Sequence, residues 1–116
     1  LSKIKELMEQ PKKEKRILIR KRDYAILELF YATGIRLSEL VGLNIGSVNH
    51  EESLLKVIGK GNKERIVPFG KKAKIAKEQY LNERGDGWGS QSDLPLFMGT
   101  KKNRISNRTV QNRLKK

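Results

Sequence analysis

The chain has 116 residues, which is enough for one ordinary domain or part of one and too few for two separate cores. Its 26 Lys and Arg residues outnumber its 13 acidic residues, and the resulting charge of +13 favours a polyanionic partner, with nucleic acid ahead of an anionic membrane surface. The absence of cysteine excludes disulfides and thiolate metal sites, and the lack of a long apolar run or signal-peptide core leads us to expect a cytoplasmic protein without a membrane partner.

The N-terminal third is predicted to form two helices joined by a basic connection. Residues 1–10 place apolar side chains on one helical face, and Pro11 is expected to end this helix. The Lys- and Arg-rich residues 11–22 are interpreted as the connection. Asp23 is expected to cap the second helix, and Gly34 suits the left-handed conformation just past its end.

A short helix capped by Ser38 is predicted next, followed by a turn-like stretch at residues 44–52. Two strand-like runs follow, residues 54–58 and residues 64–68, and both carry β-branched side chains. Residues 59–63 (GKGNK) lie between them and are typical of a hairpin loop. The two runs are therefore expected to pair in an antiparallel manner.

The last part of the chain is predicted to contain two further helices separated by loops. Residues 71–84 form a basic helix, residues 85–90 form a glycine-rich loop, and residues 106–116 begin another helix. The fold class is therefore mainly α with a small antiparallel β-hairpin or sheet (α+β). The inward-facing positions of the two helices are Ala73, Ala76, Tyr80, Leu81, Val110 and Leu114. The expected core residues are Leu7, Ile26, Leu29, Phe30, Leu40 and Tyr80.

Arg36 lies at the turn that Gly34 opens, three residues before Glu39. A surface ion pair between Arg36 and Glu39 explains this spacing without any function, and such a pair contributes about 0–1 kcal/mol to stability. In the alternative interpretation, Glu39 orients the guanidinium so that its planar donors bind two oxygens of a phosphate. Spacing alone favours the ion pair.

The loop between the two strands also has two interpretations. It is either a solvated loop whose lysines discourage aggregation of a sheet edge, or a narrow basic ribbon that contacts DNA. Gly59 and Gly61 allow the backbone around Lys60 to turn sharply and to approach another surface closely. Spacing alone slightly favours the solvated loop.

Residues 31–40 (YATGIRLSEL) and residues 57–68 (VIGKGNKERIVP) together resemble the catalytic domain of tyrosine site-specific recombinases. This is the phage integrase family, and the resemblance is closest to its Xer-type branch. In that family the first segment carries a catalytic arginine and the second carries a catalytic lysine, and Arg36 and Lys60 match these positions. Both motifs stand in the family's order, and the resemblance extends over nearly the whole chain.

The resemblance implies transesterification at a DNA phosphate. A tyrosine attacks the phosphorus, a 3′-phosphotyrosyl link forms, and the 5′-hydroxyl leaves, with no metal and no other cofactor. Arg36 is then expected to stabilise charge on the non-bridging oxygens, and Lys60 is expected to protonate the leaving oxygen. Glu39 matches an acidic position of the family and is interpreted as an orienting residue.

The implied partner is double-stranded DNA, without a small-molecule substrate, and complete members of the family act as tetramers on paired sites. Lys63 and Arg65 are expected to hold the DNA backbone. Further phosphate contacts are expected from the basic C-terminal residues, although a solvated helix face explains each of them equally well. These residues are Lys101, Lys102, Arg104, Arg108 and Arg113.

Several parts of the family pattern have no match in the chain. The His-x-x-Arg box and the nucleophilic tyrosine are absent, so residues 1–116 are expected to form a partial catalytic domain that lacks the N-terminal DNA-clamping domain and cannot cleave DNA alone. His50 is interpreted as a solvated loop residue. Three tyrosines are interpreted as packing residues with a polar tip and not as nucleophiles, namely Tyr24, Tyr31 and Tyr80.

Two rival hypotheses stand beside the enzyme segment. The first is a DNA-binding module without chemistry, such as a truncated competitor of a recombinase. The second is a small basic RNA-binding or ribosomal protein. This second rival explains the charge but not the two ordered motifs, so it ranks last.

Overall fold

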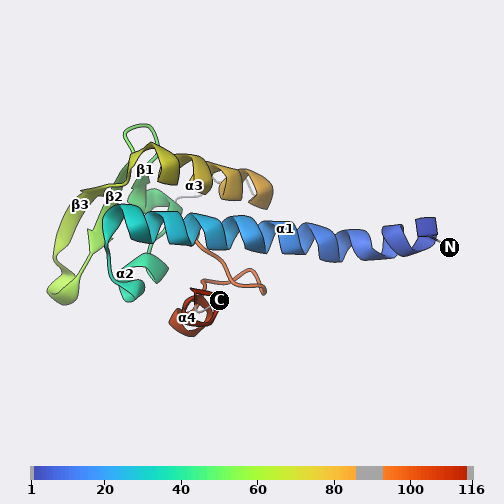
Figure 1. Cartoon of the computed structure of the whole chain (residues 1–116). Coiled ribbons are helices and arrows are strands. Elements are labelled where there is room, and N and C mark those ends of the chain that lie inside the picture. The colour runs from blue at the N-terminus through green and yellow to red at the C-terminus, as the bar shows by residue number, and fades with distance from the viewer. Residues whose placement is uncertain (1, 86–92, 115–116) are drawn as a thin grey trace.

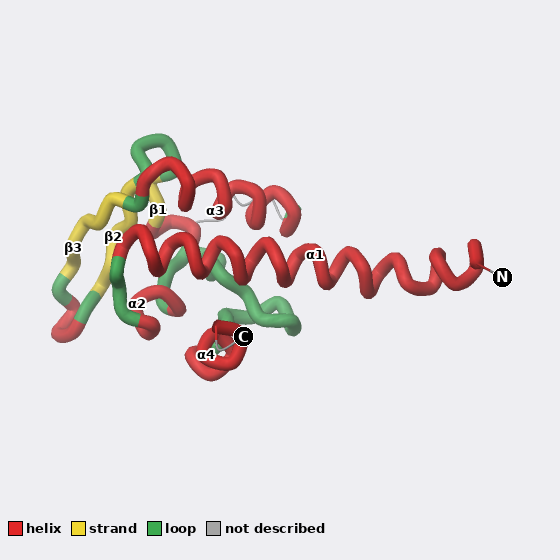
Figure 2. The backbone as a smooth tube through the Cα atoms, in the orientation of Figure 1, coloured by secondary structure: helices red, strands yellow, loops and turns green. Residues whose placement is uncertain are grey.

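The computed structural model describes the backbone of residues 2–85 and 93–114, and side chains from residue 15 onward. Within these ranges the chain is mainly helical and carries one small antiparallel sheet, as predicted (Figures 1 and 2). The elements are α1 (Ser2–Thr33), α2 (Leu37–Val41), η1 (Ile45–Ser47), β1 (Val48–Asn49), β2 (Leu54–Ile58), η2 (Lys60–Asn62), β3 (Glu64–Pro68), α3 (Gly70–Arg84) and α4 (Asn107–Leu114).

The first helix is one element where two were predicted. The helix α1 runs without a break through Pro11 and through the basic residues 12–22. The predicted end at Pro11 is therefore wrong, because the Lys, Arg, Glu and Leu residues that follow favour a helix and together outweigh the cost of one proline. In Figure 1 the N-terminal half of α1 extends well beyond the other elements.

The sheet is an antiparallel meander in the order β1–β2–β3. The strands β2 and β3 have the predicted bounds, and in their register Leu55 lies opposite Val67 and Val57 lies opposite Arg65. Because side chains alternate along a strand, these four share the inner face, where Leu55 and Val57 are buried. The strand β1 was not predicted, since two residues within a turn-like stretch give no periodic signal.

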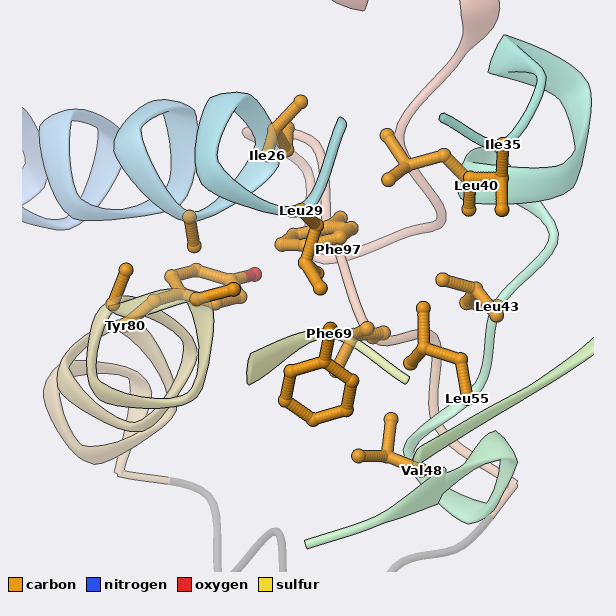
Figure 3. Close-up of a cluster of buried hydrophobic side chains, with 14 of the residues drawn as sticks. Ile26, Leu29, Ile35, Leu40, Leu43, Val48, Leu55, Phe69, Tyr80 and Phe97 are labelled. Atoms are coloured by element: carbon orange, nitrogen blue, oxygen red, sulfur yellow. The ribbon is translucent and has the colours of Figure 1, made fainter. Parts of the chain in front are cut away.

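The core forms where α1, α2, α3 and the inner face of the sheet meet (Figure 3). The helices α1 and α3 lie side by side, and the apolar segment at Leu96 and Phe97 fills the space beneath them. Of the expected core, Phe30 is only partly buried and the side chain of Leu7 lies outside the described residues. The other expected core residues are buried, namely Ile26, Leu29, Leu40 and Tyr80.

Both C-terminal helices lie close to the predicted positions. The inward residues of α3 are buried as expected, and the Tyr80 hydroxyl accepts a hydrogen bond from the Met98 backbone N–H at 3.1 Å. In α4, Val110 is buried, whereas Leu114 is exposed, which corrects its assignment to the inner face. The expected loop at residues 85–90 lies, apart from its first residue, outside the described residues.

Asp23 lies inside α1 and does not cap it, contrary to the prediction. One carboxylate oxygen accepts two hydrogen bonds from the buried Arg22 guanidinium, at 3.1 and 2.9 Å. The other oxygen accepts a bond from Arg113 Nε at 2.7 Å. Asp23 therefore attaches α4 to α1, and this tertiary role replaces the local capping role that its position suggested.

Lys77 and His50 form a polar contact inside the fold. The Lys77 side chain is fully buried, its Nζ contacts His50 Nδ1, and it lies 5.6 Å from the centre of the Phe69 ring. His50 is thus a partly buried bridge to α3, and its interpretation as a solvated residue is wrong. Burial lowers the pKa of Lys77 to about 8, and burial together with the nearby Lys77 charge lowers the pKa of His50.

We predict that Lys77 makes the stability of the fold vary with pH in the alkaline range. Its pKa rises from about 8 in the folded chain to 10.5 in the unfolded chain, so the unfolded chain binds more protons between these values. The free energy of unfolding should therefore rise with pH across this window by about 2–3 kcal/mol relative to Lys77→Met. Urea unfolding of both proteins below and above the window measures this rise. A difference between them that stays constant with pH would contradict the prediction.

Candidate active site

Arg36 stands at a sharp turn between α1 and α2. Gly34 adopts the predicted left-handed conformation, with a φ of 65°, and its N–H donates to the Phe30 carbonyl at 2.9 Å. Arg36 then takes the N-cap position of α2 in an extended conformation, so the predicted cap at Ser38 is wrong. The cap forms here because the Glu39 carboxylate reaches back and accepts the Arg36 backbone N–H at 2.8 Å.

Lys60 stands at the tip of the β2–β3 hairpin, as predicted. The loop is closed by a hydrogen bond of 2.8 Å from the Gly59 N–H to the Lys63 carbonyl. Gly61 and Asn62 adopt positive φ values of 74° and 59°, which turn the chain back toward β3. The side chains of Lys60 and Lys63 are exposed.

The Glu39 carboxylate joins these two segments. Arg65 on β3 donates from Nη1 to Oε2 at 2.7 Å and from Nη2 to Oε1 at 3.0 Å, which is a forked pair. Gly59 lies against the same pair, since a Cβ there would stand 3.1 Å from Glu39 Oε2 and 3.4 Å from Arg65 Nη1. One carboxylate thus holds the backbone of Arg36 and lies against the residue that precedes Lys60.

This geometry corrects the partner expected for the Arg36 guanidinium and gives Arg65 a contact that the sequence did not predict. The acidic partner expected for the Arg36 guanidinium is used by Arg65, and Glu39 holds Arg36 through its backbone. Within the described parts of the chain, the Arg36 guanidinium is exposed and makes no hydrogen bond or ion pair. Arg65 was expected to hold DNA, yet both of its terminal nitrogens are directed to Glu39.

The ionisation of Glu39 follows from these contacts. The side-chain bonds from Arg65, and next the backbone N–H of Arg36, lower the pKa of Glu39 from its usual 4.5 to about 2. The same pair raises the pKa of Arg65. Burial of the Glu39 side chain, which is only 8% exposed, raises the pKa of Glu39, but the hydrogen bonds outweigh that effect. Glu39 therefore stays ionised near neutral pH and is suited to hold cations and donors rather than to transfer protons.

The basic residues of the C-terminal part divide into two groups. Arg104 Nη1 donates to the carbonyls of Val41 and Leu43 at 2.9 and 3.0 Å, and its Nη2 bonds Asn44 Oδ1. Arg104 therefore stabilises the end of α2, and Arg113 similarly holds α4 through its bond to Asp23. The other group is exposed and lacks a hydrogen-bond or ion-pair partner among the described residues, namely Lys101, Lys102 and Arg108.

The three tyrosines differ in their environments. Tyr80 is buried with a hydrogen-bonded hydroxyl and packs on Phe97, as a packing residue should. Tyr24 and Tyr31 are 46% and 82% exposed, so the packing interpretation is wrong for Tyr31 and holds at most in part for Tyr24. Both lie on the face of α1 turned away from the core, where apolar periodicity alone does not reveal exposure.

We predict that the low pKa of Glu39 depends on Arg65. In the Arg65→Gln variant the pKa should move from about 2 toward 4.5, because the largest lowering contact is lost. The stability contributed by the pair is present above pH 4.5 and is lost as the pH falls toward 2. Carbon NMR of the side-chain carboxyl during an acid titration of both proteins measures the change. An unchanged Glu39 pKa in Arg65→Gln would show that the pair does not form.

Comparisons with known proteins agree with these motifs. Residues 2–116 match the model of the phage integrase family. A tyrosine recombinase XerC from Haemophilus influenzae is 50% identical over 93 residues, which cover 80% of this chain and 31% of that protein. A tyrosine recombinase XerC from Thermodesulfovibrio yellowstonii is 48% identical over 109 residues, which cover 90% of this chain and 36% of that protein.

A solved structure supports the fold. The crystal structure of XerA recombinase matches with a TM-score of 0.69 and 29% identity, over 88% of this chain and 38% of that chain. This chain therefore spans about a third of the length of the proteins that it matches. No helix among the described residues is long and apolar enough to cross a membrane. The match over residues 2–116 and the level of identity to the XerC proteins show that the chain belongs to the phage integrase family of tyrosine recombinases.

Proposed function

We propose that the chain supplies two catalytic cations, Arg36 and Lys60, to the cleavage and rejoining of DNA strands in site-specific recombination. The observation that carries this proposal is the shared anchor at Glu39, which bonds the Arg36 backbone and lies against Gly59, next to Lys60. Two segments far apart in the sequence are thereby fixed at one end of the molecule, near α2 and the hairpin tip in Figure 1. Both cationic side chains are exposed there and free to meet a phosphate.

The two cations suit different parts of the reaction. When a tyrosine oxygen attacks the phosphorus, negative charge develops on the non-bridging oxygens, and the forked donors of Arg36 stabilise that charge. The bond from phosphorus to the 5′-oxygen then breaks, and Lys60 transfers a proton to the departing oxygen. The ionised Glu39 has no proton to give and serves to position the two segments.

The remaining groups belong, in this proposal, to other parts of a complete recombinase. The matched relatives are about three times as long as this chain. We place the His-x-x-Arg box and the nucleophilic tyrosine in the part of the protein that follows the match, and a DNA-clamping domain in the part that precedes it. Residues 1–116 are then a partial catalytic domain without cleavage activity of its own. The complete enzyme would act on double-stranded DNA as a tetramer on paired sites.

The proposed DNA surface includes the outer face of α4. Val110 packs inward, and Arg113 is held by Asp23, so the exposed residues of α4 lie on the opposite side. This exposed face bears Arg108 beside three amide side chains, which are residue types that bind phosphates and base edges. We assign phosphate contacts to Lys63, Lys101 and Arg108, and a structural role to Arg104. The amide residues are Asn107, Gln111 and Asn112.

The catalytic roles predict different responses to a modified substrate. In the complete recombinase that carries this chain, Lys60→Ala should slow strand cleavage about 10²- to 10⁴-fold. Arg36→Ala should slow it about 10²- to 10³-fold, while both variants still bind the DNA site. Replacing the leaving 5′-oxygen with sulfur should restore Lys60→Ala only, because a thiol with a pKa of about 8.5 leaves without a general acid.

Cleavage of matched oxygen and sulfur substrates under single-turnover conditions separates these roles. Lys56→Ala, which removes another exposed lysine of the hairpin, is the control and should cleave normally. Normal cleavage by both Arg36→Ala and Lys60→Ala would remove the catalytic assignment and leave DNA binding as the function of this chain.

The two groups of C-terminal arginines predict opposite effects on binding and folding. Arg108→Ala should weaken duplex binding for all sequences and reduce the slope of affinity against salt by about 1, with little change in unfolding. Arg104→Ala should instead lower the free energy of unfolding by about 1–3 kcal/mol, because it removes the hydrogen bonds of one guanidinium to two carbonyls and to Asn44 at the end of α2. Salt-dependent binding and urea unfolding of both variants test the division, and a reversed pattern would contradict it.

A further inference from the structure

We propose that Arg65 is a positioning residue that sets the place of Lys60 relative to Arg36, and that it does not act as a DNA contact. This inference rests on the catalytic roles proposed above. Arg65 is the arginine of the hairpin, and its guanidinium is hydrogen-bonded to the Glu39 carboxylate.

The outer half of the hairpin has few buried side chains that could fix its position relative to the helices. Val57 is the last fully buried residue of β2 before the tip, and Ile58 beyond it is exposed. Along the returning strand, Glu64 and Ile66 are exposed as well. Within the part of the chain that the structure describes, the Arg65–Glu39 pair is the hydrogen-bonded contact between this outer half and the helices.

The pair is placed to transmit position to both cations. Arg65 lies opposite Val57 in the strand register and therefore on the face that turns toward α2. Glu39 Oε1 accepts both the Arg65 Nη2–H and the Arg36 backbone N–H. A displacement of Arg65 would thus shift the strand that carries the loop and would loosen the turn that carries Arg36. The planar fork of an arginine fixes direction as well as distance, which a lysine cannot do.

Gly59 supplies a second observation that is independent of the Arg65 charge. Its φ of −98° and ψ of −161° are accessible to alanine, so backbone conformation does not demand glycine there. Space is tight there, because a Cβ would stand 3.1 Å from Glu39 Oε2 and 3.4 Å from Arg65 Nη1, so the ion pair would have to shift by a few tenths of an ångström. The residue before Lys60 is thus packed against the ion pair itself.

The experiment compares Arg65→Gln, Arg65→Lys and Gly59→Ala in the complete recombinase, with Lys56→Gln as the matched control. Lys56 is an exposed basic residue of the same hairpin, and its ion pair with Glu64 stays within the hairpin and does not involve Glu39. Three quantities are measured for each variant: affinity for the DNA site as a function of salt, cleavage of the oxygen substrate, and cleavage of the substrate with sulfur at the leaving position.

Arg65→Gln and Gly59→Ala should lose about 10- to 100-fold in cleavage of the oxygen substrate, because a small misplacement of a catalytic group is costly. Their affinity and salt slope should remain those of the parent. The sulfur substrate should restore the part of the lost rate that comes from a misplaced Lys60, but not the part that comes from a loosened Arg36. Arg65→Lys should fall between the parent and Arg65→Gln. Lys56→Gln should cleave both substrates like the parent.

A reduced salt slope in Arg65→Gln, or a cleavage defect that sulfur leaves unchanged, would overturn the positioning role. The catalytic proposal fails separately, and it does so if Lys60→Ala itself is not restored by sulfur. Amide hydrogen exchange distinguishes a failure of the positioning role of Arg65 from a failure of the catalytic role of Lys60, because exchange does not depend on chemistry at Lys60. The N–H groups of Arg36 and Gly59 should exchange faster in Arg65→Gln than in Lys56→Gln, and equal rates would refute the positioning claim whether or not Lys60 is the general acid.

Discussion

The arrangement of the site depends on the Glu39 carboxylate. This residue lies in the first turn of a five-residue helix, which is too short to be stable through its own hydrogen bonds. Its two oxygens receive the N-cap N–H of that helix and the fork of Arg65 from the sheet. The short helix and the hairpin therefore stabilise each other, and the same hydrogen bonds lower the pKa of Glu39 and keep its carboxylate charged. Without this carboxylate, no shared contact would fix the turn at Arg36 relative to the tip of the hairpin.

Several positively charged side chains of this chain stabilise the fold itself. Arg22, Arg84 and Arg104 donate to backbone carbonyls of irregular segments that have few partners in helices or strands. Guanidinium groups suit this task because several donors on one rigid plane satisfy several acceptors at once. The total of 26 Lys and Arg residues therefore overstates the number of side chains that are free to contact a polyanion directly. Composition alone predicts a nucleic-acid partner but cannot separate the bracing arginines from the free ones.

The sequence predicts β2, β3, the hairpin loop and α3 closely, because strand alternation, turn residues and helical periodicity are local signals. It fails at Pro11, Asp23 and Ser38, where helix ends depend on the neighbouring helix formers and on tertiary partners. The buried contact between Lys77 and His50 leaves no local trace, since the two residues lie 27 positions apart. The Arg65–Glu39 pair was not predicted either, although the sequence contains part of the signal for it. The two-residue period of β3 places Arg65 on the inner face with Val67, and that face turns toward α2.

The sequence leaves two roles open for Arg36, an ion pair with Glu39 or a phosphate contact, and the structure excludes the first of them. Glu39 forms its ion pair with Arg65, so the acid nearest to Arg36 is already neutralised. Had Glu39 paired with the Arg36 guanidinium, a phosphate would have had to displace a carboxylate that is bound at short distance. Arg65 instead takes the carboxylate, while Glu39 keeps the Arg36 backbone in place. The guanidinium is thereby fixed at its base and free at its end, which is the state that electrostatic preorganisation of a phosphate site requires.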